Sequence, residues 1–309
     1  MARTTHAAVI GAALALLAGC GGSDESSSGA PRFVDEATSA GIDHVYAGEF
    51  EFFVGGGVAA FDCTGDGKDE LYFAGGTNPA ALYRNESPTG GALRFTAVPS
   101  SVTDLTEVTG AYPIDIDSDG VTDLAVLRRG SNVLLRGLGD CAFEDATEAF
   151  GIDGGNDWTV AFSATWEGSN ALPTLAFGSY LTIEDRTKCG DSRLLRPVDD
   201  AAYADPIALS PAYCTLSILF SDWGGSGRRD LRVANDRHYY REGSEQLWRI
   251  ASDEPPREFT EADGWKQLQI WGMGIASHDL TGDGLPEVFI TSQGDNKLQT
   301  LEAGPDRPT

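Results

Sequence analysis

The chain is poor in positive charge and in recognisable catalytic motifs, and each shortage removes a class of function. Its 22 Lys and Arg residues stand against 47 Asp and Glu residues in 309, which gives a net charge of −25. We expect no nucleic-acid partner, because phosphate recognition needs a basic face that releases counterions. No Gly-x-Ser-x-Gly elbow, His-Glu-x-x-His pair or phosphate-cradling Gly loop occurs. We therefore expect a protein that is not an enzyme.

Long apolar runs are also missing, and the apolar stretch from Ala7 to Ala18 is too short to cross a bilayer permanently. It follows a short basic start, as in an export signal, and ends in Leu-Ala-Gly-Cys, which resembles the lipobox of bacterial lipoproteins. We expect residues 1–19 to be a lipoprotein signal peptide, Cys20 to carry the lipid, and residues 20–31 to be a flexible tether. The alternative is an ordinary signal peptide with an incidental cysteine. The protein is expected to be exported and lipid-anchored to the bacterial cell envelope, outside the cytoplasm, with membrane contact through the anchor only.

A unit of about 54 residues recurs along the rest of the chain. Each copy contains an apolar strand, an acidic Gly-rich loop and a second apolar strand, and two further short extended segments usually follow. The copies lie at residues 58–76, 112–130, 162–180 (degenerate), 219–236 and 275–294. One such unit cannot bury both of its faces, so neighbouring units must stack. The predicted fold class is all-β, a β-propeller of four-stranded blades with five repeats visible, over residues 32–309.

The closure of this propeller has two possible forms. The fifth unit ends near Leu301 without a fourth strand, and residues 32–42 are similar to residues 143–152, which form a fourth strand in the second unit. The N-terminal strand then completes the last blade and closes a five-bladed ring without exposed sheet edges. Alternatively, the chain is part of a larger, seven-bladed propeller.

Cysteine is scarce, and four residues remain after Cys20. An even number in an oxidising compartment, without a Cys-x-x-Cys pair, predicts two disulfides rather than a metal site. Four cysteines allow three connectivities. We favour Cys189–Cys214, which closes an insertion, and Cys63–Cys141, which joins neighbouring repeats.

The second acidic loop, DIDSDGVTD, has the spacing of a calcium site. Asp115, Asp117, Asp119 and Asp123 occupy loop positions one, three, five and nine, and Val121 offers its backbone carbonyl at position seven. The pattern is similar to the first half of an EF-hand loop, with a strand following in place of the helix. Hard oxygen ligands on a flexible loop suit Ca²⁺ better than Mg²⁺.

Two other loops keep the pattern with three carboxylates each. Loop one offers Asp62, Thr64, Asp66, Glu70 and the Lys68 carbonyl, and loop five offers Asp279, Thr281, Asp283, Glu287 and the Leu285 carbonyl. Loop three, near Trp166, and loop four, from Asp222, have lost their middle acids and are expected to be empty. We predict about three Ca²⁺ sites, the tightest at loop two. The alternative is that the loops are solvated turns without metal.

These units resemble FG-GAP/VCBS repeats, known from integrin alpha-chain propellers. The segments DLRVAND and WGMGIASHDLTGDGLPEVFITSQGDNKLQT further resemble bacterial relatives of the cartilage acidic protein family. The resemblance covers about residues 32–309 and implies a propeller with Ca²⁺ in the loops at Asp62, Asp115 and Asp279. Family members are often longer, with more repeats and a further C-terminal module, so the number of blades stays open.

One cluster is a candidate ligand contact. Arg237, His238, Tyr239, Tyr240 and Arg241 combine aromatic and basic side chains after a strand, a composition typical of binding hot spots, although a solvated strand end has equal weight. We expect a cell-surface calcium-binding module for adhesion to an extracellular protein or glycan. The alternative is a calcium-dependent, lyase-like enzyme acting on polysaccharides, for which only His238 with its flanking arginines offers a base near an acidic sugar.

Overall fold

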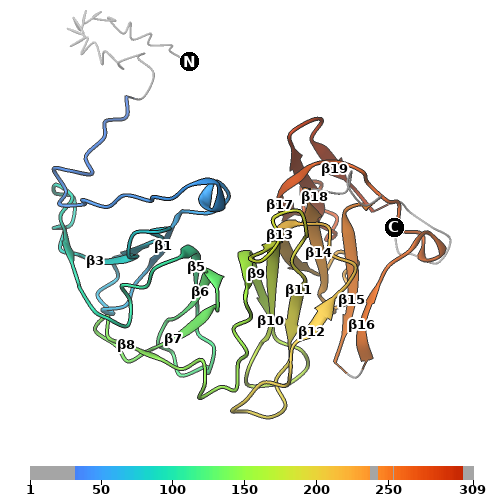
Figure 1. Ribbon diagram of the computed structural model, residues 1–309, viewed down its shortest axis with the longest axis horizontal. Helices are drawn as coiled ribbons and strands as arrows, with labels where there is room; N and C mark the ends of the chain where they lie inside the picture. Colours follow the sequence, from blue (N-terminus) through green and yellow to red (C-terminus); the bar gives the residue numbers. More distant parts are fainter. Residues whose placement is uncertain (1–31, 237–242, 253, 302–309) are drawn as a thin grey trace, which may run out of the picture. The chain divides into compact units, whose positions relative to one another are not determined.

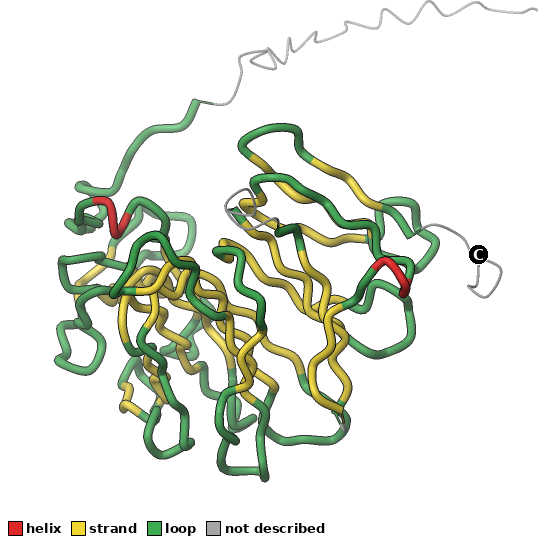
Figure 2. The backbone as a smooth tube through the Cα atoms, turned by 45° about the vertical axis from the view of Figure 1, so that its right-hand side comes forward, coloured by secondary structure: helices red, strands yellow, loops and turns green. Residues whose placement is uncertain are grey.

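The computed structural model describes residues 32–236, 243–252 and 254–301. The chain divides into two units, residues 1–35 and 36–309, and the strands lie in the second. Strands and loops make up nearly all of its described residues, among which two short 3-10 helices occur, η1 (Phe50–Phe52) and η3 (Glu261–Asp263) (Figure 2). Among the described residues, no helix has the length and apolar character needed to cross a membrane. The expected signal peptide, Cys20 and the tether to residue 31 lie outside the described residues.

The strands of the described ranges form four antiparallel sheets (Figure 1). The first sheet contains β1 (Val58–Phe61), β2 (Glu70–Phe73), β3 (Ala81–Asn85) and β4 (Phe95–Ala97). The second contains β5 (Val108–Ile114), β6 (Asp123–Gly130), β7 (Val133–Gly137), β8 (Phe143–Asp145), β9 (Asp157–Thr165), β10 (Thr174–Thr182), β11 (Ser192–Leu195) and β12 (Ile207–Leu209). The third contains β13 (Thr215–Ser221), β14 (Asp230–Asn235), β15 (Gln246–Ala251) and β16 (Glu254–Glu258). The fourth contains β17 (Gly272–His278), β18 (Glu287–Ser292) and β19 (Lys297–Gln299).

Each acidic loop joins the first two strands of a unit in the same register. The residue before the loop pairs with the residue after it, as Ile114 does with Asp123 and Ser221 with Asp230. The same pairing occurs at Phe61 with Glu70, Thr165 with Thr174 and His278 with Glu287. The five units therefore place their loops at equivalent positions, and position nine of each loop is the first residue of the second strand.

The second strand of each unit is the most buried, because other strands flank it and packed side chains cover its two faces. All six residues of β14 are buried, whereas the outer strand β16 has no buried residue. This accounts for the apolar runs that follow the loops in the sequence, since a strand covered on both faces loses the usual polar alternation.

Apolar clusters lie between consecutive units. Tyr72 of the first unit packs with Leu124 of the second, and Ile116 of the second packs with Phe162 of the third. The same occurs between the third and fourth units, and between the fourth and fifth. Each fully buried large apolar side chain contributes about 1.5–3 kcal/mol to folding. The predicted all-β, propeller-like fold with stacked units is thus confirmed.

The second and third units are joined more closely than the repeats predict. Arg129 of β6 pairs with Trp158 of β9, and Gly130 pairs with Asp157, so that eight strands form one sheet. The sheets consequently contain four, eight, four and three strands within the described residues, and not five sets of four.

The N-terminal segment does not complete the last unit as one of the two closure forms requires. The Phe95 N–H donates to the Ala40 carbonyl (2.7 Å), and Ala47 exchanges backbone hydrogen bonds with Gly75 and Thr77. Residues 36–47 thus lie against the first sheet, and no described hydrogen bond joins them to β17, β18 or β19. Within the described residues the last sheet therefore contains three strands, and the printed contacts of residues 36–47 are with the unit that follows them.

Both favoured disulfides are confirmed. Cys63 is bonded to Cys141 and Cys189 to Cys214. The first joins loop one to the turn between β7 and β8 of the second unit, and the second joins the third unit to the start of β13. Each bond therefore fastens one unit to the next.

Candidate functional site

The first aspartate of each acidic loop closes its own turn by accepting backbone hydrogen bonds. Asp62 accepts from the Gly65 and Gly67 N–H groups, both at 2.7 Å, and Asp279 accepts from Gly282 (2.7 Å) and Gly284 (2.8 Å). The hydrogen bond from Gly67 lowers the pKa of Asp62 below its usual range. The hydrogen bond from Gly284 does the same for the pKa of Asp279.

Loop four shows that this closure does not depend on the middle acids. Asp222 accepts from the Ser226 N–H (2.9 Å) and the Gly227 N–H (2.7 Å), although Gly224 and Ser226 occupy the middle positions. The first aspartate therefore has a structural role in every loop that keeps it.

Loop two is where the structure gathers carboxylates. One oxygen each from Asp115, Asp117 and Asp119 lies within 4.8 Å of the others. Asp117 Oδ1 is buried and has no hydrogen-bond partner in the described structure. Asp119 holds the loop by accepting from the Val121 N–H (2.8 Å). Three of the predicted ligand side chains thus meet at one point, with Val121 in the same turn.

Loops one and five bring fewer free oxygens together. The middle acid of loop one, Asp66, pairs with the Lys68 ammonium (2.7 Å), and the Thr64 hydroxyl donates to Asp62 (3.3 Å). In loop five Asp283 accepts from the Leu285 N–H (2.9 Å). Thr281 lies in the same exposed turn.

The acids at position nine have a role that the sequence pattern did not indicate. Asp123 is fully buried, and its two oxygens accept from the Ile116 N–H (2.7 Å) and the Gly137 N–H (2.8 Å). Glu70 accepts in the same way from Cys63 (2.9 Å) and Asn85 (3.4 Å). These carboxylates therefore tie the loop to the third strand of the unit.

The position-nine acids of loops four and five also accept backbone hydrogen bonds. Glu287 accepts from the Leu280 N–H (2.7 Å). In loop four Asp230 accepts from the Ile250 N–H (3.0 Å) and the Trp223 indole (2.8 Å). A signal for this role was present in the sequence, because loop four keeps Asp230 after losing its middle acids.

We predict that Asp123→Asn destabilises the protein by about 1–3 kcal/mol even in EDTA. The variant keeps one acceptor for the Ile116 and Gly137 amides but turns an NH₂ group toward the other, and an unsatisfied buried amide carries a cost of that size. Chemical denaturation with excess EDTA measures the effect. Asp119→Asn is the matched control, because that exposed side chain keeps an oxygen for Val121. A native-like stability of Asp123→Asn in EDTA would show that this carboxylate serves only a metal.

A second group of metal-type side chains does not form a metal site. Cys63, Glu70 and Cys141 have ligand atoms within 4.8 Å of one another. The two sulfurs are bonded to each other at 2.06 Å, so neither is available as a thiolate. The candidate ligand cluster Arg237, His238, Tyr239, Tyr240 and Arg241 lies outside the described residues.

A comparison with known protein families supports the sequence repeat. The FG-GAP-like repeat family matches residues 62–126, which contain loops one and two. No curated protein matches the chain.

Several solved structures are similar over most of the chain. A lectin from Agrocybe aegerita, described as recognising non-reducing terminal N-acetylglucosamine, has 14% identity and a TM-score of 0.45, covering 77% of this chain and 60% of that one. BBS1N in complex with ARL6DN has 11% identity and a TM-score of 0.41, covering 79% and 78%. The Photorhabdus luminescens Tc holotoxin pore has 18% identity and a TM-score of 0.39, covering 78% and 11%. The chain thus spans less than two thirds of the lectin.

Proposed function

We propose that the protein is a calcium-binding FG-GAP-type propeller module that is exported and binds an extracellular protein or glycan. The buried, unpartnered Asp117 Oδ1 beside Asp115 and Asp119 is the observation that carries the calcium part. A buried carboxylate oxygen without a partner is costly, and clustered carboxylates repel one another. A divalent cation relieves both costs. The three carboxylates, the Val121 carbonyl and water would supply the oxygen ligands that Ca²⁺ needs.

Weaker calcium binding is proposed for loops one and five, giving about three sites. The Lys68 ammonium already neutralises Asp66, and loop five offers only Asp279 and Asp283 besides its position-nine acid. Because Glu70, Asp123 and Glu287 accept backbone hydrogen bonds, their service as ligands would require sharing those oxygens with the metal. Charge count then places loop two first in affinity.

We predict that EDTA lowers the melting temperature and that added Ca²⁺ restores it. Calcium at 100 times its Kd stabilises a single site by about 2.7 kcal/mol. Asp117→Asn should remove most of this response and leave the melt in EDTA unchanged or slightly higher, because Asp117 Oδ1 makes no hydrogen bond there and the variant removes one of three clustered charges.

The matched control is Asp222→Asn in loop four. It weakens the bonds to Ser226 and Gly227 and therefore lowers the melting temperature equally with and without calcium. If neither EDTA nor added Ca²⁺ changes the melting temperature of the wild type, the calcium site is refuted. A full response in Asp117→Asn would place the site elsewhere.

The wider architecture is also part of this proposal. The five units would be five blades of a larger propeller. The second and third of these blades are joined by the pairing between β6 and β9. Export through the signal peptide and anchoring through Cys20 would place the module outside the cytoplasm on a lipid tether. We propose a binding role and not a catalytic one, because the acidic loops are built for structure and cation binding and the sequence has no catalytic motif.

A further inference from the structure

A buried arginine replaces an apolar residue in one unit. The second residue after position nine is Tyr72 in the first unit, Ala125 in the second, Ala176 in the third and Phe289 in the fifth. In the fourth unit it is Arg232 of β14, which is only 5% exposed. A buried cation is costly unless it is paired, so its presence at a core position calls for an explanation.

The contacts of Arg232 include no close carboxylate among the described residues, and Glu245 acts on its charge only from a distance. Its Nη1 donates to the Gln299 Oε1 (2.7 Å), and its guanidinium carbon lies 5.0 Å from the centre of the Trp265 ring. Its Nε has no hydrogen-bond partner, and among the described residues no carboxylate oxygen lies within 4.0 Å of the guanidinium. Burial lowers the pKa of Arg232 to about 10, which still leaves it protonated at neutral pH.

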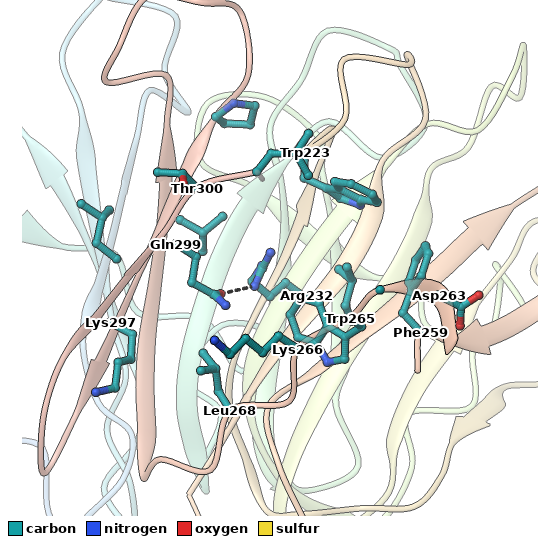
Figure 3. Close-up of a pocket in the computed structure, with 16 residues that line it drawn as sticks. Trp223, Arg232, Phe259, Asp263, Trp265, Lys266, Leu268, Lys297, Gln299 and Thr300 are labelled. Carbon is teal, nitrogen blue, oxygen red and sulfur yellow. Dashed lines mark hydrogen bonds between the residues drawn. The ribbon is translucent and has the colours of Figure 1, made fainter. Parts of the chain in front are cut away.

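Arg232 lines a cavity of about 350 Å³ between β14, β18, β19 and the loop that carries Trp265 (Figure 3). Lys266 and Lys297 also line it, and they are two of only four lysines in the chain. Among the described residues that line it, Asp263 is the one carboxylate. It is already satisfied by the Arg257 guanidinium and by the Thr260 N–H and hydroxyl, all at 2.9 Å.

This cationic lining contrasts with the acidic composition of the protein. With a net charge of −25, the chain as a whole repels anions. Arg232 and Lys266, with the bordering Asp263 neutralised, form a local site at which an anion is favoured, and Lys297 adds a third cation whose ammonium lies 3.9 Å from the exposed Asp295 carboxylate.

The rest of the wall is aromatic and held in place. Trp223 and Phe259 line the cavity together with Trp265. The centres of the Trp223 and Phe259 rings are 5.9 Å apart in an edge-to-face arrangement. The backbone N–H of Trp265 donates to the carbonyl of Thr260 (3.1 Å), the residue just before η3. Trp265 Nε1 has no hydrogen-bond partner in the described structure. Aromatic faces beside unpaired donors are suited to a ligand with both apolar C–H surface and oxygen acceptors.

We infer that this cavity binds a carboxylate-bearing sugar, a uronate residue of an acidic glycan. The stacked guanidinium of Arg232 offers the planar geometry that carboxylates prefer, Lys266 and Lys297 add attraction, and the aromatic side chains pack against the sugar ring. The volume lies within the usual range of small-molecule sites, about 300–1,000 Å³. The inference rests on the proposed binding role and is independent of calcium.

The test compares a glucuronic acid oligosaccharide with the neutral glucose oligosaccharide of the same length and linkage, by calorimetry on the full chain. We expect the acidic sugar to bind at least about tenfold more tightly, since a charge-assisted hydrogen bond is worth that much or more. Lys266→Gln combined with Lys297→Gln should weaken binding about tenfold, and Arg232→Met should weaken it further. Lys188→Gln is the control, because that lysine does not line the cavity.

Equal affinity for the two sugars would overturn the inference. Undiminished binding by the double lysine variant would do so too, because its exposed or half-buried side chains can change without unfolding the protein. If neither sugar binds while the melting temperature still depends on calcium through Asp117, the proposed sugar site is refuted and the proposed calcium site stands. If the acidic sugar binds and calcium has no effect on the melt, the calcium site is refuted and the sugar site stands.

Discussion

Removing the disulfide between Cys63 and Cys141 is expected to lower the free energy of unfolding by about 4–5 kcal/mol. The bond joins residues 78 positions apart, and the loss of chain entropy in the unfolded state grows with the length of the closed loop. Both cysteines are buried in the cluster between the first two units. The double variant Cys63→Ala, Cys141→Ala, measured by chemical denaturation, gives the value directly.

The other disulfide provides the internal control. Cys189 and Cys214 are 25 positions apart, so the corresponding double alanine variant should lose less, about 3–4 kcal/mol. An equal or larger loss for the shorter loop would mean that local packing around the sulfurs, and not chain entropy, determines the stabilisation.

Glu245→Gln is expected to change how stability depends on pH above neutrality. Glu245 is fully buried beside β14 and β17, where burial raises the pKa of its carboxyl group to about 9. One oxygen accepts from the Asn235 N–H (3.0 Å), and the other has no hydrogen-bond partner in the described structure. The folded state therefore holds a proton that the unfolded state has released.

The sign of the effect follows from this difference in bound protons. Between the ordinary pKa of 4.5 and the folded value near 9, the unfolded state binds fewer protons, so stability falls as pH rises. The slope is about 1.4 kcal/mol per pH unit at most. From pH 7 to 9 the wild type should lose about 2 kcal/mol more than Glu245→Gln, whose neutral amide imitates the protonated acid.

Denaturation curves at several pH values between 7 and 9 measure this slope. Asp123, whose pKa burial raises to about 6, has finished titrating by then and does not interfere. Glu261→Gln, a change at an exposed residue of η3, should run parallel to the wild type. Parallel curves for Glu245→Gln as well would mean that Glu245 is ionised in the folded protein at pH 7.

The repeats made most of the fold predictable. The five loops fixed the positions of the hairpins because each loop is followed by an apolar strand, and Cys63–Cys141 could be placed between neighbouring units on that basis. Cys189–Cys214 was favoured for another reason, because it closes an insertion. The pairing of Gly130 with Asp157 could not be foreseen, since hydrogen bonds between units depend on how closely two strand ends approach. The contact of residues 36–47 with the first sheet could not be foreseen either, because the similarity of residues 32–42 to residues 143–152 does not say which sheet receives the segment.

The site was less predictable than the fold. The spacing of Asp115, Asp117 and Asp119 indicated the carboxylate cluster correctly as a place where side chains meet. The same pattern gave no means of separating a metal ligand from a residue such as Asp123, which accepts two backbone amides. Arg232 and Glu245 were missed because their importance lies in burial and missing partners, which only the packing of β14 against β17 and β18 reveals.

The fastenings between units are unevenly distributed. A disulfide joins the first unit to the second, strand pairing joins the second to the third, and a disulfide joins the third to the fourth. Within the described residues, the boundary between the fourth and fifth units has neither. Amide hydrogens near β17 should therefore exchange through the least costly local opening of the molecule. The cavity around Arg232 lies at this boundary, so a ligand bound there would act as the fastening that the chain itself does not provide.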